Sequence, residues 1–290
     1  MNVINTIMRV YELVFLIHDV HGDKEAMKNC LNSAEKASRY FRKQESYAIY
    51  YDMVSNYYDI LLDGHYDTES TDEELLLNKM LDAIEKTLHY SKRGLSHDSN
   101  HLYVKNLLAK ATILTRSGRG TEKEISNLID TAKKIIEENT SQYAEVRLQY
   151  YLVCAWYSAL VHDNAKAADM FIKKARELSD IITPTDLQKI EDVIIPSANI
   201  FFELDCYSNA MGLLYEGTRI CAKHANTDSY AHIRQELYNH LWEVGIEAQQ
   251  FELCQKIMKL IEVENEEIID SKNRIIIPDE VRSIISEKTT

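Results

Sequence analysis

The chain has 290 residues, of which 45% are hydrophobic and 27% charged, so it can bury one or two sizeable cores and is not a disordered tail. Its eight glycines and three prolines fall far below the roughly 12% of average usage. This excludes glycine-rich phosphate loops and turn-dense β-sandwiches and favours long helices with short connections. A net charge of −13 disfavours nucleic-acid partners, because acidic side chains repel phosphate backbones.

No apolar run is long enough to span a bilayer, and the first residues lack the features of a secretory signal. The five cysteines are scattered singly through apolar segments without a CxxC pair, which is typical of buried thiols in a reducing compartment. We therefore expect a soluble, cytoplasmic protein with neither a disulfide framework nor a membrane partner.

Apolar residues recur at helical spacing along nearly the whole chain, and short polar stretches divide them into twelve main helices arranged as pairs. The expected ranges are 2–20, 24–40, 43–63, 71–93, 99–116, 121–138, 141–161, 164–179, 185–204, 207–223, 227–247 and 249–262. Residues 262–270 are acidic and expected to be frayed. Residues 275–277 are apolar, and Pro278 suits the first turn of a final short helix ending near Ile285.

Two local signals refine these helices. Three starts carry the spacing of a capping box, in which two side chains satisfy unpaired amides of the first turn: Thr71 with Glu74, Thr121 with Glu124, and Thr185 with Gln188. Pro196 lies inside the ninth helix, where it removes a backbone donor and clashes with the preceding turn. The sequence therefore predicts a kink or break at that point.

The strongest signal is a residue pattern that recurs in the second helix of each pair. Ala168, Ile172 and Ala175 are spaced by four and three residues, and the same spacing returns 42 residues later. A small residue in this pattern lets two helix backbones approach closely. The other expected contact positions are Ala26, Cys30 and Ser33; Leu77, Leu81 and Ile84; Ile125, Ile129 and Ala132; Ala210, Leu214 and Gly217; and Leu253, Ile257 and Leu260. Helical hairpins repeated in this way stack into a solenoid.

The first helices add to the pattern, since Ala155, Trp156 and Ala159 precede one set and Ala198 and Phe201 precede the next. Together these residues resemble the tetratricopeptide repeat (TPR), in a lengthened and degenerate form like that of bacterial regulatory and sensor proteins. The interval is 42 to 43 residues, against about 34 in the family. The resemblance covers residues 1–262 and implies an all-α, right-handed α–α superhelix, or TPR-like solenoid, of about six helical hairpins. Residues 263–290 are then an acidic linker and a C-terminal capping helix.

The resemblance implies a non-enzymatic scaffold that binds a protein or peptide in its concave groove. The alternative is the ligand- or peptide-sensing input region of a bacterial signalling protein, which would close around its ligand. Transferring the family's concave positions to this chain gives Asn106, Lys110, Tyr150, Tyr157, Asn199, Tyr238 and Trp242 as candidate binding residues. An asparagine there can bond to an extended peptide backbone, and a lysine can meet a terminal carboxylate. The 18 tyrosines have an alternative role in packing between repeats.

No motif for catalysis accompanies the repeats: GxSxG, GxxxxGK and GxGxxG are absent. His97 and His101 are four residues apart but lack a third metal ligand at a suitable spacing. We expect no catalytic residues, no cofactor and no metal. The sequence leaves open the identity of the partner, the formation of a homo-oligomer, the presence of an output domain after Thr290, and whether the concave or the convex face binds.

Overall fold

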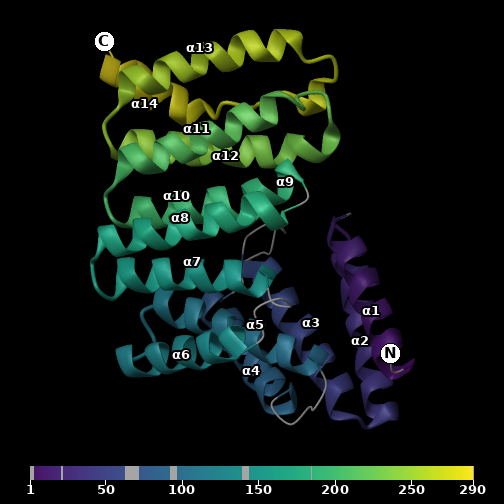
Figure 1. The fold of residues 1–290 in the computed structure, drawn as a ribbon. Helices are drawn as coiled ribbons and strands as arrows, with labels where there is room; N and C mark the ends of the chain where they lie inside the picture. The colour runs from purple at the N-terminus through teal and green to yellow at the C-terminus, as the bar shows by residue number, and fades with distance from the viewer. Residues whose placement is uncertain are drawn as a thin grey trace. The chain divides into compact units, whose positions relative to one another are not determined.

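A computed structural model describes residues 3–20, 22–62, 72–91, 97–138, 144–183 and 185–289. Within these ranges the chain is α-helical with short turns, and no β-strand occurs. Many helices that follow one another in the sequence, such as residues 44–62 and 73–91 or residues 207–222 and 228–247, lie side by side and run in opposite directions (Figure 1). The structure is therefore all-α and built from sequential antiparallel pairs, as the sequence predicts.

The chain divides into two compact units, Met1–Val146 and Arg147–Thr290. The first contains α1 (Val3–Val20), α2 (Lys24–Phe41), α3 (Gln44–Leu62), α4 (Glu73–Ser91), α5 (His97–Arg116) and α6 (Glu122–Glu138). Helix α7 (Ala144–Leu160) begins just before the division. The second unit continues with α8 (Ala165–Ile182), α9 (Asp186–Lys189), α10 (Ile195–Glu203), α11 (Tyr207–Ala222), α12 (Asp228–Glu247), α13 (Phe251–Glu267) and α14 (Asp279–Thr289).

The helix starts follow the local capping chemistry. The amide of Glu124 donates to the Thr121 hydroxyl at 3.2 Å, and the amide of Gln188 donates to the Thr185 hydroxyl at the same distance, so the threonine half of both predicted capping boxes is confirmed. Thr71 lies outside the described residues. Helix α4 is capped by Asp72, whose carboxylate accepts from the amide of Leu75 at 3.2 Å.

The predicted break near Pro196 is present and takes a specific form. Helix α9 passes into a π-helical segment over residues 190–194, and α10 starts at Ile195. The amide of Ile195 bonds to the carbonyl of Ile190, five residues back. Widening the helix in this way relieves the clash between the proline ring and the preceding turn, because the carbonyl that it would strike is moved outward.

The repeating contact pattern is present, but its register differs by one residue in three helices. Ile125, Ile129 and Ala132 are buried as predicted, and so are the sets in α8 and α11. In α2 and α13 the predicted positions Ser33, Leu253 and Leu260 are exposed instead, whereas Cys30, Ile257 and, in α4, Ile84 are buried as predicted. The neighbouring residues that are also buried or packed are Met27, Leu31 and Ala34; Leu76, Met80 and Ala83; and Cys254, Met258 and Ile261. An apolar residue directly after each predicted position in α2 and α13, and directly before each one in α4, made the register ambiguous in the sequence.

Each unit encloses its own apolar core. One cluster in the first unit joins Met8 and Phe15 of α1 to residues of α2 and α3, and the large cluster of the second unit extends from α7 to Ile285 of α14. Four of the five cysteines are buried and all five are unpaired, which confirms the prediction of free thiols. The acidic segment after residue 262 is not frayed as expected, because α13 remains helical to Glu267. The predicted boundary at residue 262 therefore falls inside a helix.

Two glycines offer a matched test of helix packing in the second unit. A Cβ on Gly245 of α12 would lie 2.4 Å from the Cys254 sulfur of α13, whereas a Cβ on Gly212 of α11 would meet nothing within 4 Å. We expect Gly245→Ala to lower the free energy of unfolding by about 1–3 kcal/mol because it overpacks this contact. Gly212→Ala should raise it by up to about 1 kcal/mol through helix propensity. Urea unfolding of both variants measures the difference, and equal stability would contradict the packing argument.

Candidate functional site

The two predicted site residues of the first unit lie on α5 and are held by neighbouring side chains. Asn106 is buried, with 2% of its surface exposed, and its amide nitrogen donates to the Asp52 carboxylate at 2.8 Å and to the Leu102 carbonyl at 3.0 Å. Lys105 also reaches Asp52, at 3.0 Å. Asp52 is itself 1% exposed, so this polar cluster joins α3 to α5 within the unit.

Lys110 links three helices. Its ammonium lies 2.6 Å from Glu85 of α4 and 3.0 Å from Glu124 of α6. Burial lowers the pKa of Lys110, but the hydrogen bonds to both glutamates outweigh that effect, and the pKa is raised above its ordinary value. The lysine is therefore charged at neutral pH and engaged in holding α4, α5 and α6 together.

In the second unit, Tyr238 and Trp242 of α12 are core residues. They are 5% and 2% exposed, and their rings stack with centroids 6.3 Å apart. The Tyr238 hydroxyl donates to Glu264 at 3.2 Å, and burial, together with the Glu264 charge, raises the pKa of Tyr238. These two residues do not line an open groove, in contrast to the sequence expectation, because the last helices of the unit cover them.

The remaining predicted residues are half-buried. Tyr150 and Tyr157 lie on α7 and Asn199 on α10. The ring of Tyr150 packs against the ring of Tyr151. The ring of Tyr157 contacts the His162 ring edge-on, with the two ring centroids 4.7 Å apart. Two of the seven candidates thus belong to the first unit and five to the second, and three of them are buried. They do not form a single described surface.

Many tyrosines pack against one another, and the largest such cluster lies within one predicted helical pair rather than between repeats. Tyr90 of α4 stacks on Tyr47 and Tyr51 of α3, with centroids 5.2 and 5.7 Å apart, and the Lys86 ammonium lies 5.3 Å from the centre of the Tyr51 ring. Burial raises the pKa of the neighbouring Tyr50 to about 12. This tyrosine cluster joins α3 to α4 and leaves its rings only partly exposed.

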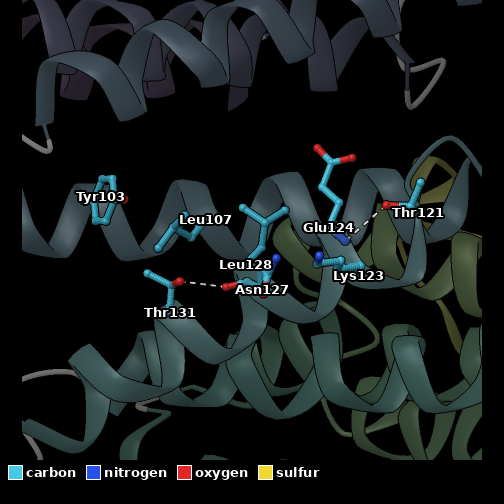
Figure 2. A pocket seen from close by; sticks show the side chains of 8 residues that line it. All are labelled: Tyr103, Leu107, Thr121, Lys123, Glu124, Asn127, Leu128 and Thr131. Atoms are coloured by element: carbon cyan, nitrogen blue, oxygen red, sulfur yellow. Dashed lines mark hydrogen bonds between the residues drawn. The ribbon is translucent and has the colours of Figure 1, made fainter.

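An open depression of about 420 Å³ lies between α5 and α6, beside Lys110. Tyr103 and Leu107 come from α5, while the other lining residues come from the start and the outer turns of α6, as Figure 2 shows. Those residues are Thr121, Lys123, Glu124, Asn127, Leu128 and Thr131. Leucines and a tyrosine thus provide an apolar floor, and hydroxyl, carboxamide and charged groups provide the rim.

This depression has the chemistry to hold an extended segment. Among the described residues, no protein group bonds to the carboxamide of exposed Asn127; its backbone carbonyl accepts from the Thr131 hydroxyl at 2.7 Å. A free carboxamide can accept from a peptide N–H and donate to a peptide carbonyl at the same time. Leu107 and Leu128 beside it can cover one apolar side chain of such a segment.

The second unit contains an extended segment that is already held in this manner. Gln235 of α12 accepts from the amide of Ile276 at 2.7 Å and donates to the same residue's carbonyl at 2.9 Å. Asn265 of α13 does the same for Ile275, with both bonds at 2.8 Å. Two carboxamides therefore bracket two consecutive residues of an extended backbone.

The side chains of that segment alternate as an extended chain requires. Ile275 and Ile277 are buried in the core of the second unit, whereas Ile276 is 72% exposed. Upstream, the buried Arg234 donates to the carbonyl of Asn273 at 2.7 Å. The segment thus covers the apolar side of the last helices, and Ile285 of α14 is buried in the same core, as predicted for a C-terminal cap.

Sequence reasoning did not find Gln235 or Asn265. Both are ordinary polar residues at helical positions, and their role depends on a segment ten to forty residues away meeting them in space. The one available signal was the apolar run at residues 275–277, which indicated a covering segment without indicating what held it.

No group of three or more histidine, cysteine, aspartate or glutamate side chains suited to a metal occurs in the parts of the chain that the structure describes. The side chain of His97 lies outside the described residues. The helices in those same parts are too short or too polar to cross a bilayer. No protein-family model matches the sequence, and no curated protein is significantly similar to it. The tetratricopeptide resemblance therefore remains an interpretation of the repeat.

We expect Gln235→Ala to expose the amide of Ile276. Removing one acceptor worth about 1 kcal/mol should raise the hydrogen-exchange rate of that amide roughly five- to ten-fold, because the side chain of Ile276 gives it no other cover. Gln255→Ala, on α13 but away from the segment, is the control and should leave the rate unchanged. Equal exchange in both variants would show that the carboxamide does not hold the segment.

Proposed function

We propose that this chain is a non-enzymatic binding protein that holds an extended peptide or protein segment on a helical scaffold. In this proposal the antiparallel pairs are turns of a lengthened, right-handed tetratricopeptide-like solenoid, and recognition uses side chains that project from adjacent helices. The proposal concerns binding alone, and no step of bond making or breaking is assigned to any residue.

One observation carries the proposal: the scaffold already holds an extended backbone in its own second unit. Gln235 and Asn265 bracket two consecutive residues by paired hydrogen bonds, and isoleucines on alternate positions fill the apolar surface below. Hydrogen bonds to the main chain of a bound segment give affinity that does not depend on its sequence. The apolar sites that take every second side chain of the segment give selectivity. The same combination is the expected way for this scaffold to take a segment from another protein.

The depression between α5 and α6 is the described surface best suited to such a segment. It pairs an apolar floor with the unengaged carboxamide of Asn127, whereas Tyr238, Trp242 and Asn106 are buried, and the polar groups of Tyr238 and Asn106 are already hydrogen-bonded. Lys123 and Glu124 on its rim carry opposite charges. We therefore expect a ligand with one aliphatic or aromatic anchor, an extended backbone beside it and no large net charge.

A selection from a random library of twelve-residue peptides, displayed on phage, tests the proposal with the full chain as bait. The selected peptides should share an apolar anchor. Asn127→Ala should weaken their binding by about 1 kcal/mol, roughly five-fold in Kd, through the lost backbone bonds. Leu128→Asp should weaken it more strongly, because a carboxylate would stand on the apolar floor.

Asn29→Ala is the matched control, since Asn29 is an exposed asparagine on α2, far along the chain from the depression. It should leave the affinity unchanged. Selected peptides that bind Asn127→Ala and Leu128→Asp as tightly as the native chain would place recognition elsewhere. A library that yields no peptide above background would contradict the proposed function.

A further inference from the structure

Helix α1 presents an outward face that is almost wholly aliphatic. Of its described side chains, eight are exposed, and seven of these are valine, leucine or isoleucine: Val3, Ile7, Val10, Leu13, Val14, Leu16 and Ile17. Val3 is 71% exposed and Leu13 60%. The eighth is Thr6, so no charged side chain is among them. In a chain with a net charge of −13, an uncharged surface of this kind is a marked exception.

The opposite side of α1 packs inside the first unit. Asn5, Met8 and Phe15 are buried, and α1 packs against α2 and α3. The thiol of Cys30 on α2 also donates to the carbonyl of Tyr11. The helix is therefore formed and oriented before any partner arrives, and a partner does not bear the cost of ordering it.

The exposed face follows a heptad seam. Val3, Ile7, Val10, Val14 and Ile17 are spaced by four, three, four and three residues, which is the alternation of core positions in a coiled coil. All five are β-branched, so their rotamers are restricted in a helix and little side-chain entropy is lost on packing. Arg9, Glu12 and Asp19 lie off this seam, and Arg9 pairs with Glu12 on the same helix.

Four of the five seam residues, Ile7, Val10, Val14 and Ile17, are also placed symmetrically about the level of residue 12, and Val3 lies beyond them. If two copies of α1 lie antiparallel with a two-fold axis level with residue 12, Ile7 faces the partner's Ile17 and Val10 faces the partner's Val14. Each layer then pairs identical side chains, and each core position of one helix meets the complementary core position of the other. A surface that is complementary to itself under a two-fold rotation is what an isologous dimer requires.

We propose that the outer face of α1, the residues just described, is a dimer interface in which two copies of this chain pair their α1 helices antiparallel. Charge is compatible with this occupant, because a face without charged side chains brings no pair of like charges into contact when two of these acidic chains meet there. The buried area also supports a second copy as the occupant. Two such faces together bury about 1,000 Å² or slightly more, which is near the lower limit of a specific interface. The dimer is therefore weak and depends on concentration.

Sedimentation equilibrium of the full chain tests the pairing. The mass should rise from one chain toward two as concentration increases from about 1 to 100 µM, the range that a Kd near 10 µM would span. The double variant Val10→Glu with Val14→Glu should stay at the mass of one chain, because four carboxylates would meet in the seam. Circular dichroism of that variant should match the native chain, since both positions are exposed.

The matched control is Leu253→Glu with Val263→Glu, which adds the same charge at exposed aliphatic positions of α13. It should dimerise like the native chain. The proposal would be overturned if the native chain keeps the mass of one chain at 100 µM. If the Val10 and Val14 changes also lowered the stability of that monomer, another part of the same chain would cover the face. Binding of the monomer to phosphatidylcholine vesicles through α1 would also overturn it.

Cysteine cross-linking tests the direction of the pair. In a Cys206→Ser background, which removes the one partly exposed native thiol, Val10→Cys mixed with Val14→Cys should form a disulfide across chains under mild oxidation. Val10→Cys by itself should cross-link slowly, because in the antiparallel pair residue 10 faces residue 14. Rapid cross-linking of Val10→Cys with itself and none in the mixture would indicate parallel helices and contradict the proposed pairing.

Discussion

Close contact between paired helices is the constraint on which the rest of this structure depends. The second helices of successive pairs carry a buried position that is nearly always small: Ala34, Ala83, Ala132, Ala175 and Gly217. A Cβ on Gly217 would already lie 2.9 Å from Leu237 of the next helix, so larger residues are excluded there.

This packing also decides which side chains remain available to a ligand. Asn106, Tyr238 and Trp242 stand at positions that a thinner repeat would leave open, but here neighbouring helices bury them and engage the polar groups of Asn106 and Tyr238. In our proposal, recognition therefore uses polar residues near the edges of the pairs. Gln235 and Asn265 demonstrate the chemistry on the chain's own extended segment, and Asn127 provides it beside an open apolar floor.

The apolar surface near the C-terminus is covered by the chain itself, whereas the apolar face of α1 is exposed. At the C-terminal end, an extended segment and α14 cover the last helices and contribute Ile275, Ile277 and Ile285 to the core. Helix α1 at the N-terminal end has no such cover among the described residues, and its outward face stays aliphatic. In the proposed solenoid each end needs a polar or covered surface, and in our proposal the C-terminal segment covers one end and a second copy covers the other.

The sequence by itself determined the helical class, the pairs, most helix ends to within a few residues, and the interruption near Pro196, because periodicity, caps and proline act over one or two turns. It predicted the free thiols for the same local reason. Tertiary structure alone decided the contact register in α2, α4 and α13, since an apolar residue stood directly beside each predicted position. It also decided the burial of Tyr238 and Trp242 and the pairing of Gln235 and Asn265 with residues 275 and 276. Those outcomes depend on which distant segment meets each side chain, and no local pattern encodes that.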